Sequence, residues 1–156
     1  MIDPTSETRR MPRAIFVNLP VTDLPRAIAF YEALGGRREP RFSDNTAACM
    51  VLSEAISIML LIHPKFAGFT PRPVSDARAA TEVLLCIPVD SREAVDATIE
   101  ATAAAGGSPD PAPRQDQGFM VGRSVEDPDG HIWEVIWMDM AAFDAAKAGC
   151  APEQTA

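Results

Sequence analysis

The sequence predicts an α+β fold in which two β-α-β-β-β repeats form one cupped mixed sheet around a ligand cavity. The first observation is a duplication: an apolar strand, a polar cap, an amphipathic helix and a double glycine occur twice in the same order. Aligning Pro20 with Pro88 superposes the two copies. The second observation is that strand-like stretches follow each helix. A sheet covered by helices on one face leaves the other face open, and such hollowed faces commonly bind ligands.

The first repeat is predicted to span residues 13–63. Residues 15–21 form an apolar strand, and residues 24–34 carry apolar side chains at helical spacing. Asp23 is expected to cap this helix, because its carboxylate can accept the free amides of the first turn. The double glycine that follows ends the helix, since glycine adopts the left-handed conformation without strain. The remaining strands are expected at 38–43, 46–52 and 55–62.

The second repeat is predicted to span residues 81–139. It opens with a strand over 85–89, and Ser91 is expected to cap a helix over 92–105. A type I turn at 127–130 (DPDG) joins the last two strands, because proline suits its second position and glycine its fourth. The strands after the helix are expected at 110–115, 119–125 and 131–138.

Three further segments complete the predicted organisation. Residues 1–12 are expected to form a mobile tail, residues 64–80 a proline-containing connector, and residues 140–156 a C-terminal helix and tail. Residues 13–139 then form a single domain, which suits a chain of 156 residues.

Composition argues against several classes of partner. The net charge of −8 opposes nucleic-acid binding and favours a cationic small-molecule ligand. The longest apolar runs, 56–62 and 83–89, are far shorter than the roughly 20 residues of a membrane span, so no membrane partner is expected. The cysteines lack zinc or redox spacing. We interpret Cys49 and Cys86 as small core residues and expect a reducing, cytoplasmic location.

Two segments carry a family resemblance. Residues 16–36, from Phe-Val-Asn-Leu-Pro-Val-Thr-Asp to the double glycine, form the opening strand and helix, and residues 126–135 (EDPDGHIWEV) form the last hairpin. Over residues 13–139 the chain resembles the vicinal oxygen chelate superfamily, which includes glyoxalase I, extradiol dioxygenases, fosfomycin-resistance proteins and bleomycin-resistance proteins. It looks closest to glyoxalase-like and dioxygenase-like members that end in a Trp-x-Glu-Val-x-Trp-Met-Asp strand. The resemblance implies the cupped fold and assembly as a homodimer.

The resemblance also implies four metal-ligand positions, on the first and last strands of each repeat, which hold His, Gln or Glu in metal-dependent members. The two first-strand positions are occupied by Phe16 and Leu84, whose side chains cannot bind a metal ion. The last strand of the second repeat keeps Glu134, and its counterpart in the first repeat is Ile58 or Met59. We therefore expect neither a metal centre nor another cofactor, as in a subgroup that lacks most of the metal ligands.

Glu134 is the main candidate for chemistry, because a carboxylate flanked by isoleucines needs a partner. It acts as a general base or binds a cationic or hydroxyl-bearing ligand; alternatively, it pairs with Arg123 across the hairpin or is a remnant of a lost site. Arg123 orients an anionic substrate or pairs with Glu134. Trp133 and Trp137 lie on the opposite face of the strand and are expected to pack against helices. The residues predicted at the ligand site are Phe16, Asn18, Met59, Leu84, Cys86, Arg123 and Glu134.

The sequence is compatible with three functions. The first is a glyoxalase-like or bleomycin-resistance-like protein that binds a small molecule without a metal. The second is an enzyme, namely a lyase, an isomerase or an extradiol dioxygenase, that uses Glu134 as a base or as one metal ligand. The third is a structural or regulatory protein whose cavity is filled by its own side chains. The sequence favours the first and leaves open the identity of the ligand and whether a reaction is catalysed.

Overall fold

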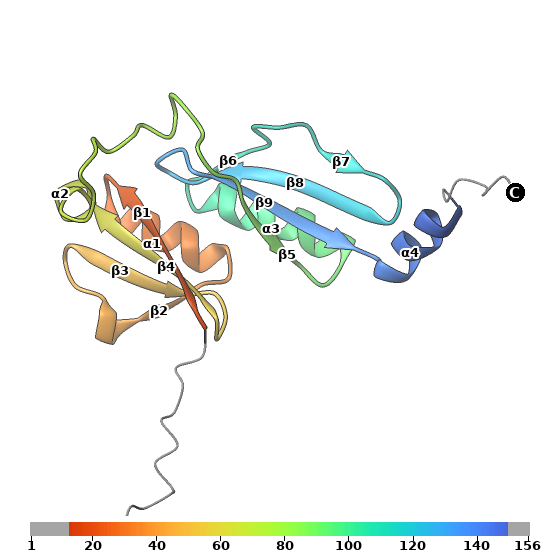
Figure 1. Cartoon of the computed structure of the whole chain (residues 1–156), viewed down its shortest axis with the longest axis horizontal. Coiled ribbons are helices and arrows are strands. Elements are labelled where there is room, and N and C mark those ends of the chain that lie inside the picture. Colours follow the sequence, from red (N-terminus) through yellow and green to blue (C-terminus); the bar gives the residue numbers. More distant parts are fainter. Residues whose placement is uncertain (1–12, 150–156) are drawn as a thin grey trace, which may run out of the picture.

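The computed structural model describes residues 13–149. Residues 1–12 and 150–156, which include both predicted tails, lie outside the described residues. The first repeat occupies the left of Figure 1. Its elements are β1 (Ile15–Val21), α1 (Leu24–Ala33), β2 (Arg37–Glu39), the 3₁₀ helix η1 (Pro40–Phe42), β3 (Ala47–Val51) and β4 (Ile56–Ile62).

The second repeat occupies the right of Figure 1. Its elements are β5 (Leu85–Pro88), α3 (Arg92–Ala104), β6 (Ser108–Pro109), β7 (Gln115–Asp116), β8 (Met120–Glu126) and β9 (Ile132–Met138). Between the repeats, the connector begins with the short helix α2 (His63–Ala67) and continues to β5 without a further helix or strand. A last helix, α4 (Met140–Gly149), follows β9.

The strands form two hydrogen-bonded sheets. The first has the order β1-β4-β3-β2, and the second has the order β5-β9-β8-β6, with β7 paired to β8. In each sheet the first and last strands of the repeat are parallel neighbours, and the other pairs are antiparallel. The predicted α+β class with two repeats is therefore confirmed. The arrangement differs from the expected single cupped sheet, because β1 and β5 are edge strands of separate sheets.

Both predicted helix caps are present. Asp23 Oδ1 accepts a hydrogen bond from the amide of Arg26 at 3.0 Å. Ser91 Oγ accepts one from the amide of Ala94 at 3.1 Å. The first residue of each double glycine has a positive φ, 101° at Gly35 and 99° at Gly106, which ends the helices where the sequence predicts.

Two predicted strands are shorter than expected, and proline explains both. Residues 38–43 contribute only to β2 and then enter η1, because Pro40 has no amide to donate and occupies the first turn of that helix. Residues 110–115 are mostly loop between β6 and β7, since Pro111 and Pro113 cannot donate to a sheet.

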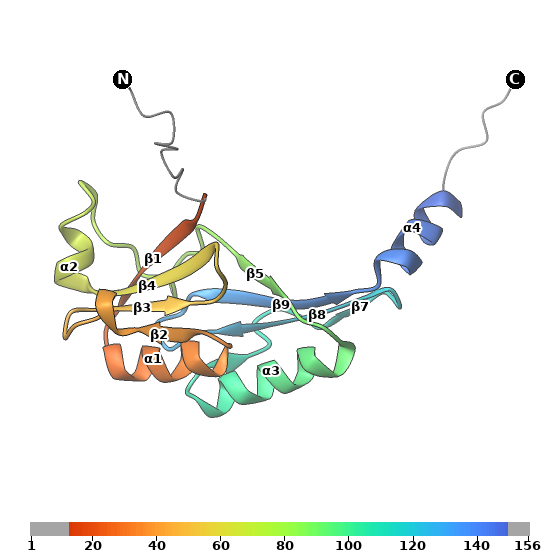
Figure 2. The same ribbon diagram turned by 90° about the horizontal axis from the view of Figure 1, so that it is seen from below.

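Helices α1 and α3 cover the same side of the two sheets (Figure 2), so each sheet has one covered face and one open face. Alternate strand residues such as Ile58 and Leu60 are fully buried on the covered face. Side chains of both repeats, including Phe30 and Ile99, form one continuous apolar core. Trp133 is buried in this core, as its parity in the strand predicts.

A buried polar network joins the repeats. The hydroxyl of Tyr31 donates to Asp127 Oδ2 at 2.8 Å, and the indole N–H of Trp133 donates to the same hydroxyl at 3.1 Å. Burial and the charge of Asp127 raise the pKa of Tyr31 well above its ordinary value, so the hydroxyl keeps its proton. Nearby, Asp129 Oδ1 accepts from the amide and the hydroxyl of Thr22 at 2.9 and 2.7 Å. These bonds fasten the β8–β9 turn of the second repeat to the first repeat.

Helix α4 lies apart from this core, on the open-face side of the molecule (Figure 2). Asp139 caps it by accepting from the amide of Ala142 at 3.0 Å. Phe143 packs edge to face on Phe119, with ring centroids 5.5 Å apart. None of the helices within residues 13–149 is long and apolar enough to cross a membrane.

Candidate functional site

The open faces of the two sheets carry most of the predicted site residues. On the first sheet Asn18 pairs with Met59, and on the second Cys86 pairs with Glu134. Because the repeats superpose with their strand prolines aligned, these two pairs occupy equivalent positions. Met59 is therefore the counterpart of Glu134, and Ile58, the other candidate from the sequence, is fully buried on the covered face.

A hollow on the open face of the first repeat includes Asn18 and Met59, and we call it the first hollow. Lys65 lies at its edge, with Nζ 2.8 Å from Thr46 Oγ1 and 3.3 Å from Asp44 Oδ2. Hydrogen bonds from Thr46 hold the pKa of Asp44 well below its ordinary value, so this edge carries an ion pair. The other lining residues are Arg41, Phe42, Ser43, Ala47, Leu61 and Phe69.

The second hollow lies on the open face of the second repeat and includes Glu134. Cys86 and Ser124 are its neighbours on the two adjoining strands. Within residues 13–149, no ion pair engages the half-buried Glu134 carboxylate. Partial desolvation and the charge of Glu134 raise the pKa of the Cys86 thiol. The other lining residues are Ala112, Pro113, Gln115, Met120, Gly122, Arg123 and Ile136.

The structure corrects the interpretation of one cysteine. Cys49 is buried, as predicted, but Cys86 is exposed and is not a core residue. The reason is parity: Cys86 faces away from the helices on β5, which is an edge strand and has a neighbour on one side only.

Arg123 borders the second hollow, but its guanidinium group is held on the covered side of the sheet. Its Nε and Nη2 lie 3.0 and 2.6 Å from the two carboxylate oxygens of Asp110, and Nη1 lies 2.8 Å from Asp96 on α3. Because Arg123 pairs with Val135, its side chain and that of Glu134 leave opposite faces of the sheet. This geometry excludes the alternative in which Arg123 pairs with Glu134, and it gives Arg123 two structural partners.

The predicted site residues thus fall into two separate groups. Asn18 and Met59 line the first hollow, Cys86 and Glu134 line the second, and the two hollows share no lining residue. Phe16 and Leu84 precede Asn18 and Cys86 by two positions on the same faces, where they are 56% and 52% exposed. The chain therefore presents two separate hollows rather than one enclosed cavity.

The donor set does not fit a metal ion. Of the four positions that the superfamily uses, three hold Phe16, Met59 and Leu84, and only Glu134 offers an oxygen donor. Within the part of the chain that the structure describes, no group of three or more His, Cys, Asp or Glu side chains is placed to hold a metal.

Sequence reasoning missed several residues that line the hollows. Ser124 lies beside Glu134, and the register of the DPDG hairpin was the signal that could have placed it there. Lys65 and Gln115 come from α2 and β7, whose positions over the sheets depend on the tertiary structure. No sequence pattern indicated either of them.

The sequence pattern of the glyoxalase/bleomycin resistance protein/dioxygenase superfamily matches residues 13–135, which include the first repeat and the second repeat as far as the middle of β9. The chain belongs to this superfamily, and the predicted resemblance is confirmed. No curated protein matches the chain.

Several solved structures share the fold of this chain. Hypothetical protein SA1046 from S. aureus is 25% identical, with a TM-score of 0.67 over 81% of this chain and 95% of that one. A glyoxalase-related enzyme from Fulvimarina pelagi is 22% identical, with a TM-score of 0.68 over 81% and 88% of the two chains. The fosfomycin resistance protein FosX from Mesorhizobium loti is 12% identical, with a TM-score of 0.61 over 85% and 98%. The last two likenesses establish the fold alone.

Proposed function

We propose that this protein is a glyoxalase-like or bleomycin-resistance-like binding protein that holds a small molecule on the open faces of its sheets without a metal ion. The observation that carries the proposal is the Glu134 carboxylate, which is half-buried between Ile132 and Ile136 without an ion-pair partner in the described residues. Removing a carboxylate from water is unfavourable unless a partner is supplied. A bound ligand supplies that partner.

The chemistry of the second hollow favours a cationic ligand. Apart from Glu134 and Arg123, the polar side chains that line this hollow are those of Cys86, Ser124 and Gln115, which are uncharged groups. The one basic residue of the lining, Arg123, is occupied by Asp96 and Asp110 on the other side of the sheet. The net charge of −8 further favours a basic ligand. We therefore propose an organic molecule that bears an ammonium or guanidinium group.

Two copies of the chain assemble the complete site in this proposal. Large apolar side chains on or next to the edge strands β1 and β5 are exposed, and a partner surface would remove them from water. A homodimer that joins the first hollow of one copy to the second hollow of its partner would cover them and enclose the ligand. The exposed residues are Ile15, Phe16, Ile56, Val83 and Leu84.

A cytoplasmic location is part of the same proposal. Cys49 and Cys86 are both free thiols in the structure. Free thiols of this kind suit a reducing compartment, where disulfides are rare.

Thermal unfolding of chelator-treated protein tests the proposal. An ion at 100 times its dissociation constant would add about 2.7 kcal/mol of stability, so Mn, Fe(II), Co, Ni and Zn should leave the midpoint unchanged. A panel of organic amines and guanidines should contain a compound that raises it. Glu134→Gln should abolish that rise, whereas Glu54→Gln, at an exposed carboxylate in the first repeat, should retain it. A saturable metal shift, or an equal ligand response in both variants, would overturn the proposal.

A metal-free lyase or isomerase is the second candidate, because the same unpaired Glu134 carboxylate could remove a proton from a bound substrate. Glu134→Gln would then abolish turnover and leave the unfolding midpoint unchanged. Turnover that survives in this variant would exclude Glu134 as the base.

A further inference from the structure

A third hollow lies between the two repeats; it shares Asn18 with the first hollow and no lining residue with the second. It is bordered by the end of β1, by connector residues 75–83 and by the start of β9. Figure 1 shows the connector running from α2 past the β8–β9 turn to β5. The polar side chains in its lining include Asn18, Glu82 and His131, and apolar walls come from Phe66, Val83, Leu85 and Ile132.

His131 is held in one orientation by a buried carboxylate. Its Nδ1 lies 2.8 Å from Asp127 Oδ2, and the Asp127 side chain has no exposed surface. Tyr31 donates to the same oxygen, and the backbone amides of Asp129 and His131 donate to Oδ1 at 2.9 Å each. The carboxylate therefore has a full set of donors, and the imidazole ring it orients is only 13% exposed.

This arrangement determines which ring nitrogen is free. Burial acts to raise the pKa of Asp127, but the hydrogen bonds that its carboxylate accepts from His131 and Tyr31 act to lower it and prevail, so the group is anionic. An anionic carboxylate only accepts hydrogen bonds, so Nδ1 carries the proton. In the neutral ring, Nε2 then carries a lone pair. An oriented acceptor at the edge of an apolar hollow is suited to a ligand with an N–H group.

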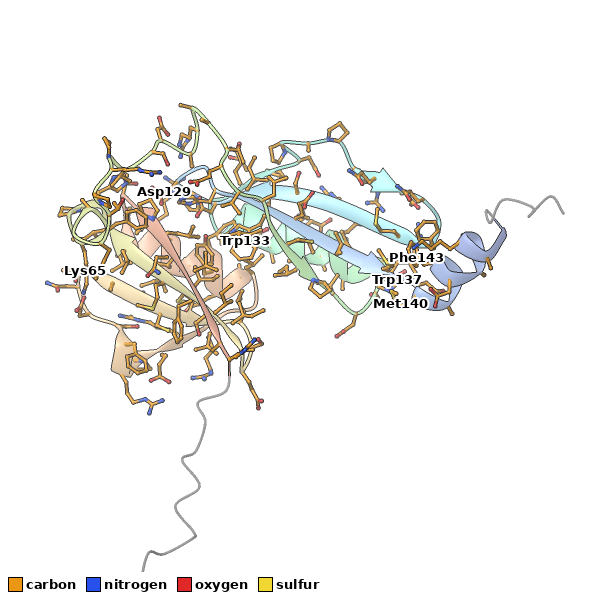
Figure 3. The ribbon with its side chains drawn as sticks, viewed as in Figure 1. Lys65, Asp129, Trp133, Trp137, Met140 and Phe143 are labelled. Atoms are coloured by element: carbon orange, nitrogen blue, oxygen red, sulfur yellow. The ribbon has the colours of Figure 1, made fainter. Side chains whose placement is uncertain are left out.

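The charges around His131 favour a cation. Glu82, which lines the hollow, is exposed and has no ion-pair partner in the described residues. Asp129, labelled near the junction of the repeats in Figure 3, lines an adjoining hollow that also contains His131. Its Oδ2 is buried without a hydrogen-bond partner within residues 13–149. That adjoining hollow also contains His63 and the positively charged Arg78, whose guanidinium group donates to the backbone carbonyl of Pro128.

We propose that the third hollow is a second ligand site, which takes an amine or amidine with an apolar body. Nε2 of His131 accepts a hydrogen bond from the cationic group, Glu82 balances its charge, and the apolar body packs against Phe66 and Ile132. Glu134, which carries the proposed function, does not line this hollow, so the two proposals can be tested separately although the hollow shares Asn18 with the first hollow.

Benzamidine is a suitable probe, because it joins an amidinium group to a flat apolar ring. The chain holds two histidines, His63 and His131, so long-range ¹H–¹⁵N spectra of the imidazoles contain two sets of signals. His63→Asn assigns them. We expect His131 to be protonated at Nδ1 in the free protein, and its Nε2 signal to shift saturably with benzamidine while the His63 signals stay in place.

Two variants separate this site from the open faces. Glu82→Gln removes a charge-assisted contact at an exposed residue and should raise the dissociation constant of benzamidine about tenfold. Glu100→Gln, at an exposed carboxylate on α3, is the matched control and should have no effect. Glu134→Gln should also leave binding unchanged. Three outcomes would overturn the proposal. The His131 signal would show no saturable shift up to about 10 mM benzamidine, or only the His63 signals would shift. Alternatively, Glu134→Gln would abolish binding and Glu82→Gln would not.

Discussion

In the first repeat, Asn18 and Met59 face the open side of the sheet, whereas the second repeat has Cys86 and Glu134 at the equivalent positions. The covered faces differ as well. The position of Arg123 in the second repeat corresponds by register to Ala48 in the first, which is fully buried under α1. Strand order, caps and helix-ending glycines are nevertheless the same. A duplicated unit thus keeps the features that its backbone requires and varies the side chains that its two faces present.

Asp127 lies in the turn between the last two strands of the second repeat, and Asp127→Ala should have the largest effect on stability. The variant leaves buried donors of Tyr31 and His131 without an acceptor. We expect a loss of about 3 kcal/mol or more in the free energy of unfolding, measured with urea. Glu54→Ala, in the exposed turn of the first repeat, should change it by less than about 0.5 kcal/mol. Similar losses in the two variants would contradict this difference between the repeats.

The buried residues of the two helices differ in type, and the largest of them, Tyr31 of α1, corresponds to Ile99 of α3. Tyr31→Phe keeps the ring but removes the hydroxyl that joins Asp127 to Trp133. It should lower the free energy of unfolding by about 1–3 kcal/mol. Ile99→Val removes one methylene and should lower it by about 0.5–1.5 kcal/mol. A neutral Tyr31→Phe would show that the network does not hold the repeats together.

The helix caps should respond equally in the two repeats. Asp23→Ala and Ser91→Ala each remove one side-chain acceptor from a first turn, and each should lower the free energy of unfolding by about 1 kcal/mol. Asp90→Ala, at an exposed residue next to the second cap, is the control and should have little effect. A loss confined to one repeat would show that the caps are not equivalent.

The ion pairs of Arg123 belong to the second repeat alone and should have the smallest effect. Hydrogen bonds from Arg123 lower the pKa of Asp96 and of Asp110. Because both pKa values are lower in the folded state, this stabilisation is complete above about pH 4 and is lost as the pH falls further. Arg123→Met should lower the free energy of unfolding by less than about 1 kcal/mol at pH 7. In urea titrations, the difference in the free energy of unfolding between Arg123→Met and the parent protein should be smaller at pH 3 than at pH 7. An equal difference at both pH values would show that these ion pairs do not stabilise the fold.

Local signals explain how much of the fold was predictable. Asp23, Ser91 and the double glycines act on backbone groups within a few residues of themselves, so their roles can be read without tertiary information. Alternation along β9 likewise placed Glu134 and Trp133 on opposite faces. The strands predicted at 38–43 and 110–115 are shorter in the structure because Pro40, Pro111 and Pro113 cannot donate a backbone hydrogen bond to a neighbouring strand.

The candidate site was less predictable, because it depends on the register between strands. Whether Ile58 or Met59 corresponds to Glu134 is decided by the pairing of β1 with β4, and a shift of one residue would reverse the faces. The orientation of Arg123 also depends on the strand register. Its place in the chain allowed a pairing with Glu134, but the β8–β9 register turns it toward Asp96 and Asp110.

The sequence by itself determined the two repeats, the capped helices and the DPDG turn, since each depends on residue type and short-range spacing. The tertiary structure alone decided how the repeats meet. Tyr31 and Asp127 are 96 residues apart in the chain and share a hydrogen bond, and no local pattern specifies such a contact. That junction leaves the two open faces as separate hollows, and it holds His131 at the edge of a third.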